Sequence, residues 1–150
     1  MKIQSDMEMK GRLTIALNDE VVQEIDNLVV TDGKEYVASR MKDATTTAMS
    51  HMAIGTDNTA AAASQTGLGT ESARVTLTST TVGTAGTADG NTITYVASFP
   101  AGTGTAGIEE AAILNASSGG IMLCRTVFPI INKSSSCLLY TSPSPRDLSE

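Results

Sequence analysis

The chain has few of the residues that carry out chemistry. Its 150 residues include one His, two Cys and no Trp, and aromatic residues make up only 3%. The single histidine, His51, has no nearby partners in the sequence that would build a catalytic triad or a metal site, so we expect it to pack on a strand or at the surface. We therefore predict no enzyme, with no catalytic, cofactor-binding or metal-binding residues.

Basic stripes and long apolar runs are also missing. The net charge is −6, which predicts no nucleic-acid or anionic-membrane partner. No run of apolar residues has the length that spans a bilayer, and the opening MKIQSDMEMK does not read as a signal peptide. Cys124 lies in an apolar segment and is expected to be a small buried hydrophobe, without a disulfide, as suits a reducing cytoplasm.

What the chain does have is alternation of apolar residues with Thr and Ser, between turns rich in Gly, Asp and Asn. Such alternation places every second side chain on one face of a strand. It predicts a mainly β fold, an antiparallel β-sandwich of immunoglobulin-like or jelly-roll type. The expected strands span residues 11–17, 21–30, 49–55, 74–82, 92–99, 108–115 and 121–131.

Two local patterns refine this prediction. Asp32, followed three residues later by Glu35, favours a helix start, so one short helix is expected near residues 32–41. The segment 92–99 alternates most clearly, and we expect an inward row that packs against Val75 and Leu77 on a neighbouring strand. The members of this row are Ile93, Tyr95, Ala97 and Phe99.

Two motifs could signal chemistry. Residues 102–107 fit G-x-G-x-x-G, but no acidic residue follows at the spacing that a dinucleotide site uses, so a loop between strands is the favoured interpretation. Glu109 and Glu110 are adjacent and point to opposite faces of a strand, which excludes an acid/base pair. One of them is expected to face solvent, and the other to cap N–H groups of a neighbouring loop.

The remaining polar clusters are expected to be turns. Asp57-Asn58 and Asp89-Gly90-Asn91 could each offer oxygens to Ca²⁺, but neither has enough spaced ligands, and turn chemistry accounts for both. The triplets that begin at Asn115 and Asn132 have the glycosylation pattern, which matters only in a secreted protein.

The C-terminal segment CLLYTSPSPRD, residues 137–147, resembles the read-through of a sequencing-library transposase adaptor. On that interpretation residues 137–150 are a non-native tail. Residues 1–30 then form an N-terminal hairpin or extension, and residues 31–136 form the β-sandwich domain as one unit with the hairpin. That domain is expected to lack its last strand.

Three longer segments together resemble a group of tailed-bacteriophage virion structural proteins. They are NLVVTDGKEYVASRM, MAIGTDNTAAAASQTGLGTE and ITYVASFPAGTGTAGIEEAAILNASSGGIMLCRTVFPIINK, and they cover most of residues 27–133. The chain departs from the group at Ala112 and Leu114, where the group tends to have Gly and an aromatic residue. The resemblance implies a non-enzymatic component of the tail-fibre or collar kind, or a capsid decoration protein.

A virion role sets the expected partners and location. We expect docking on other tail or capsid subunits, a homo-oligomer, contact with a host surface receptor, and assembly in the host bacterial cytoplasm. The loops at residues 56–69 and 100–107 are the expected contact surfaces. The alternative from another class is a carbohydrate-binding module or small enzyme domain. It would need clustered aromatics or convergent carboxylates, and the aromatic residues Tyr36, Tyr95, Phe99 and Phe128 are few and scattered along the sequence.

Overall fold

Over its described residues, the protein is a mainly β, antiparallel structure with one helix, as the sequence predicts. The computed structural model describes residue 1, residues 8–42 and residues 46–147. Residues 2–7 and 148–150, which belong to the expected N-terminal extension and to the expected tail, lie outside the described residues. The elements are β1 (Met9–Leu17), β2 (Glu20–Val29), α1 (Thr31–Lys42), β3 (His51–Gly55), β4 (Glu71–Thr76), β5 (Ser79–Val82), β6 (Ile93–Phe99), β7 (Ala106–Leu114), β8 (Met122–Lys133) and β9 (Leu139–Asp147).

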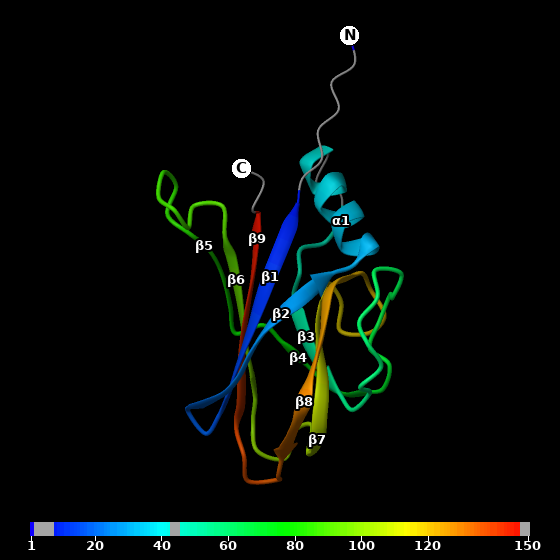
Figure 1. Ribbon diagram of the computed structural model, residues 1–150, viewed down its shortest axis with the longest axis vertical. Coiled ribbons are helices and arrows are strands. Elements are labelled where there is room, and N and C mark those ends of the chain that lie inside the picture. Colours follow the sequence, from blue (N-terminus) through cyan, green and yellow to red (C-terminus); the bar gives the residue numbers. More distant parts are fainter. Residues whose placement is uncertain (2–7, 43–45, 148–150) are drawn as a thin grey trace.

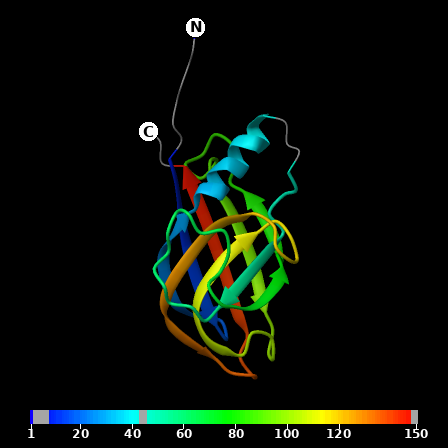
Figure 2. The same ribbon diagram turned by 90° about the vertical axis from the view of Figure 1, so that its right-hand side faces the viewer.

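The nine strands found in the described part of the chain belong to one sheet, in the order β4-β3-β7-β8-β2-β1-β9-β6-β5. The sheet curls into a half-barrel, so that the β3–β4–β7–β8 half faces the half made by β1, β9, β6 and β5 (Figure 1). Helix α1 lies across one end of the half-barrel (Figure 2). The two layers of the expected sandwich therefore come from a single curled sheet.

The hairpin β1–β2 forms where the sequence predicts it. Asn18 and Asp19 make the turn with φ angles of 49° and 66°, a conformation that Asn and Asp tolerate better than most residues. Two successive residues of this kind match the right-handed twist of the flanking strands. The turn thereby fixes the pairing of Leu17 with Glu20.

The core lies inside the curl and draws on both halves of the sheet. Tyr95, Ala97 and Phe99 are buried, and Ile93 packs against them, which confirms the predicted inward row. Val75 and Leu77 pack against the same cluster. From the facing half and the hairpin, the cluster includes Leu13, Ile15, Met52, Ile54, Ile108 and Ile113.

Two details differ from the sequence prediction. Residues 74–82 do not form one strand: β4 pairs with β3 in one half, and β5 pairs with β6 in the other. Leu77 and Thr78 carry the chain across the half-barrel, with their amides bonded to Ser50 and Val96 carbonyls. Thr92, expected on the outward face, is buried. It lies just before β6, where its amide donates to the Asp89 carbonyl and its carbonyl accepts from the Gly83 amide.

The described part of the tail also differs from expectation, since it supplies a strand. Residues 139–147 form β9, which pairs with β1 along its whole length and with β6 through residues 139–141. Leu139 and Thr141 are completely buried. An unpaired strand edge accepts almost any extended segment, because the ladder bonds only backbone groups, so β9 fills the position that was expected to be empty. Its adaptor origin remains a prediction.

Candidate functional site

A buried ion pair joins β7 and β8. Arg125 and Glu110 both have fully buried side chains, and Arg125 donates to Glu110 Oε2 from Nη2 at 2.9 Å and from Nε at 3.0 Å. Burial of two charges is costly unless further hydrogen bonds satisfy the remaining donors and acceptors. The groups that make these further hydrogen bonds to Arg125 and Glu110 therefore show what the ion pair holds in place.

Glu110 is completed by the backbone of the loop between β3 and β4, residues 56–70. Its carboxylate accepts hydrogen bonds from the amides of Asp57 at 3.2 Å, Gly69 at 2.9 Å and Thr70 at 2.8 Å. A Cβ at Gly55 would lie 2.4 Å from Glu110 Oε1 and 2.3 Å from the Thr70 carbonyl. Only glycine at position 55 allows this close approach. Because the amides bonded to Glu110 lie at the start and at the end of the loop, Glu110 caps both of its ends.

Arg125 is completed by the middle of the same loop. Nη1 donates to the Thr59 carbonyl at 2.8 Å and to Gln65 Oε1 at 3.0 Å, while Nη2 lies 3.2 Å from Asp57 Oδ2. Gln65 Oε1 also accepts from the Ala62 amide at 2.9 Å. The guanidinium thus holds the loop at three places, and its planar donors suit such multiple contacts.

The loop covers an apolar patch on the outer face of the β3–β7–β8 half. Leu68 packs there against a small cluster that is separate from the main core. Facing outward, the loop presents small side chains that carry no charge. The exposed residues are Asn58, Thr59, Ala60, Ala62, Ala63, Ser64, Thr66, Gly69 and Thr70.

A second feature is a cleft of about 370 Å³ between α1 and the β5–β6 hairpin. Its lining is mainly apolar and includes Met9, Met49 and Ile93, together with Tyr36 and Tyr95. Burial raises the pKa of Tyr95 to about 12, with a further contribution from nearby Tyr36, so the phenol stays protonated at neutral pH. Tyr36 and Tyr95, which are distant in the sequence, thus line one cleft, and both belong to the same core cluster as Phe99 and Phe128.

Several motif residues take the positions expected for them, although β7 already begins at Ala106, inside the expected loop 100–107. Glu110 caps the loop, as predicted for one of the two glutamates, and Glu109 is partly exposed. Residues 100–105 form a loop followed by β7, not by the helix that a dinucleotide site requires. His51 lies on β3, with Nδ1 at 2.8 Å from the Ser50 hydroxyl. Cys124 is buried.

Asp57 and Asp89 accept hydrogen bonds within turns, and Asp57 also forms an ion pair with Arg125. Asp57 Oδ1 accepts from the Thr59 amide at 3.3 Å, as in an Asx turn, and Asp89 accepts from the Thr87 hydroxyl. Among the described residues, no group of three or more His, Cys, Asp and Glu side chains could hold a metal ion. The reasoning from sequence missed Arg125 and Gln65; the available signal was a lone charge inside the apolar run IMLCRTVF.

The fold and the site define a curled antiparallel sheet that carries one immobilised surface loop. Searched against known proteins, the chain matches no family model, no curated protein and no solved structure. Within the described residues, none of the helical segments combines the length and apolar character that crossing a membrane requires.

Proposed function

We propose that this chain is a non-enzymatic phage virion structural protein that docks on other virion subunits, as a tail-fibre, collar or adaptor component. The resemblance of residues 27–133 to such proteins motivates the proposal. The observation that supports it best is the anchoring of loop 56–70 by the buried Arg125–Glu110 pair. A partner would meet a loop whose conformation is already fixed.

Fixed loops favour assembly for a physical reason. Ordering a mobile loop on binding costs conformational entropy, which reduces the affinity that the contacts provide. Here the six loop contacts of Arg125 and Glu110 order the loop during folding, so binding of a partner does not carry this entropy cost. Small uncharged side chains at the surface also allow the backbone of a partner subunit to approach closely. The rigid sheet then acts as the scaffold and the loop as the recognition surface.

The proposal places the protein in the virion, either in the tail or on the capsid. The protein would assemble in the host bacterial cytoplasm, as a homo-oligomer, and would reside in the virion, where a tail position also allows contact with a host receptor. Capsid decoration is the alternative within the same class. Quantitative mass spectrometry of purified virions separates the two, because a decoration protein has a high copy number and a tail component a low one.

Charge substitution in the loop tests the docking surface directly. Ser64→Arg and Thr66→Arg alter exposed loop side chains, and Thr81→Arg alters an exposed residue of β5, on the other side of the molecule (Figure 1). Each variant is mixed with the structural proteins encoded beside this gene, and complexes are separated by size exclusion. We expect a stoichiometric complex that the loop variants lose and Thr81→Arg keeps.

Two results would contradict the proposal. One is the absence of the protein from purified virions of the source phage. The other is a complex that all three variants form equally well, which would place the contact surface elsewhere on the molecule.

A further inference from the structure

Strand β2 changes its partner at Asn27. The pairing of β1 with β2 ends at Gly11 and Asn27, and the pairing of β2 with β8 consists of Leu28 with Arg125 and Val29 with Cys124. Asn27 therefore stands at the corner where the two halves of the curled sheet join. Ladder hydrogen bonds are interrupted at such a corner, so polar groups there need other partners.

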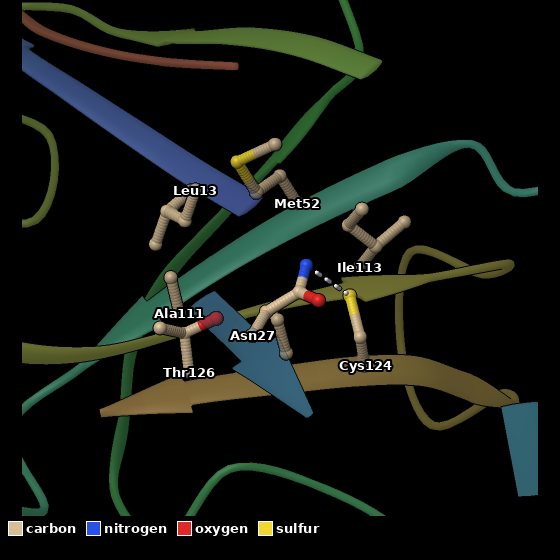
Figure 3. A pocket seen from close by; sticks show the side chains of 8 residues that line it. Leu13, Asn27, Met52, Ala111, Ile113, Cys124 and Thr126 are labelled. Carbon is tan, nitrogen blue, oxygen red and sulfur yellow. Dashed lines mark hydrogen bonds between the residues drawn. The ribbon is translucent and has the colours of Figure 1, made fainter. Parts of the chain in front are cut away.

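The side chain of Asn27 is only half satisfied. Its Nδ2 donates to Cys124 Sγ at 3.6 Å. Its Oδ1 is buried and has no hydrogen-bond partner, the single such side-chain atom within the described part of the chain. Figure 3 shows the amide directed between the strands toward the sulfur. Buried acceptors without a partner are rare in folded proteins.

Turning the Asn27 amide over, so that Oδ1 and Nδ2 exchange places, still leaves one of these two atoms without a hydrogen-bond partner. Burial raises the pKa of the Cys124 thiol to about 12, so the sulfur carries a proton that it could donate to Oδ1 if the amide were turned over. In that orientation Nδ2 would lose its contact with the sulfur. One polar atom of Asn27 is left for another partner in either case.

A cavity lies beside this amide. It has a volume of about 10 Å³ and is lined by Asn27, Cys124 and Thr126 together with five apolar or small residues. A cavity of about 10–15 Å³ accommodates one water molecule, provided that two to four polar partners surround the water. Figure 3 shows these lining side chains, with the Asn27 amide directed toward Cys124 and with Thr126 on the other side of Asn27. Size and lining thus both match a single water.

We propose that this corner is a binding site for one internal water molecule. The water donates to Asn27 Oδ1 and shares a hydrogen bond with the Thr126 hydroxyl, so that it links β2 to β8 where the ladder is short. Asn27 is the main ligand, because its oxygen has no protein partner. The site is independent of whichever partner the surface loop binds.

A high-resolution crystal structure of the full chain tests the proposal. We expect one well-ordered density peak within hydrogen-bonding distance of Asn27 Oδ1. In solution, oxygen-17 relaxation dispersion of water should report one long-lived internal water more in the wild type than in Asn27→Leu. An empty cavity, in a map that shows other internal waters, would overturn the proposal.

A second variant keeps the test decisive if Asn27→Leu does not fold. Thr126→Val has nearly the same shape and removes only the hydroxyl, so it should shorten the residence time of the water. Thr94→Val, on β6 and away from the cavity, is the matched control and should leave the dispersion unchanged. Equal dispersion in the wild type, Thr126→Val and the control would show that no water is held by these groups.

Discussion

Arg125 and Glu110 are bound to each other without being register partners. Glu110 pairs with Val127, and Arg125 pairs with Ala112, so the ion pair runs diagonally across β7 and β8. The diagonal places the guanidinium under the middle of loop 56–70 and the carboxylate under its two ends. Loop and sheet are thus linked through one pair of charges.

The first prediction concerns the loss of one charge from this pair. Arg125→Met leaves Glu110 buried without its counter-ion, which should lower the free energy of unfolding by about 3–5 kcal/mol in urea titrations. The exposed pair Arg12–Glu24 provides the control: Arg12→Met should cost less than about 1 kcal/mol. Equal losses would mean that the buried pair does not hold the loop.

The second prediction tests the register of β6. Phe99 is fully buried, so Phe99→Ala should cost roughly 3–5 kcal/mol through lost burial and the cavity that remains. Thr94 lies on the other side of the strand, and Thr94→Ala should change stability by less than about 0.5 kcal/mol. Chemical denaturation of both variants measures the difference, and similar values would contradict the register.

The third prediction concerns Gly11. A Cβ at this position would lie 2.0 Å from Asn27 Oδ1, so Gly11→Ala must displace the Asn27 side chain and should cost about 1–3 kcal/mol. Asn27→Ala removes the obstacle. In a double-mutant cycle by urea unfolding, the two changes should therefore couple by about 0.5–3 kcal/mol, whereas additive effects would show that Asn27 moves aside freely.

The fourth prediction separates the two cysteines by reactivity. Hydrogen bonds from Ser134 lower the pKa of Cys137, whereas burial raises that of Cys124 to about 12. The thiolate is the reactive form, so iodoacetamide should add once to the native protein, at Cys137, and twice in denaturant. Because its pKa is depressed, Cys137 should react at a pH below the usual thiol range, and Ser134→Ala should move that profile upward. Intact-mass measurement reports each step, and fast labelling of native Cys124 would argue against its burial.

The fifth prediction concerns β9. Removal of residues 137–150 deletes β9, one of the two strands that pair with β1. It leaves an open edge beside apolar residues, so the shortened chain should aggregate in size-exclusion chromatography. Replacement of the segment by a strand of alternating Thr and Ile or Val should restore a monodisperse protein, because pairing depends on the backbone. Removal of residues 148–150 alone is the control. A shortened chain that unfolds cooperatively as a monomer would contradict this role of β9.

Local features could be predicted from the sequence, and distant pairings could not. The hairpin turn at Asn18, the helix near Asp32 and the loop-capping role of Glu110 follow from patterns within a few residues. The partners of Arg125 are different, because Asp57 is 68 residues away and the contact depends on the register of several strands. The crossing at Leu77 was missed for a similar reason: alternation continues through residues 74–78, although the chain passes from one half of the sheet to the other.

The short junction at Leu28 and Val29 has a consequence for how the molecule opens. Only these two residues join β2 to β8, whereas the core cluster spans both halves. Cohesion between the halves thus comes mainly from the apolar core that they share. Because both halves contribute to this one core, the two-residue junction can open only when the core separates, and the amides of Leu28 and Val29 should report that event in hydrogen exchange.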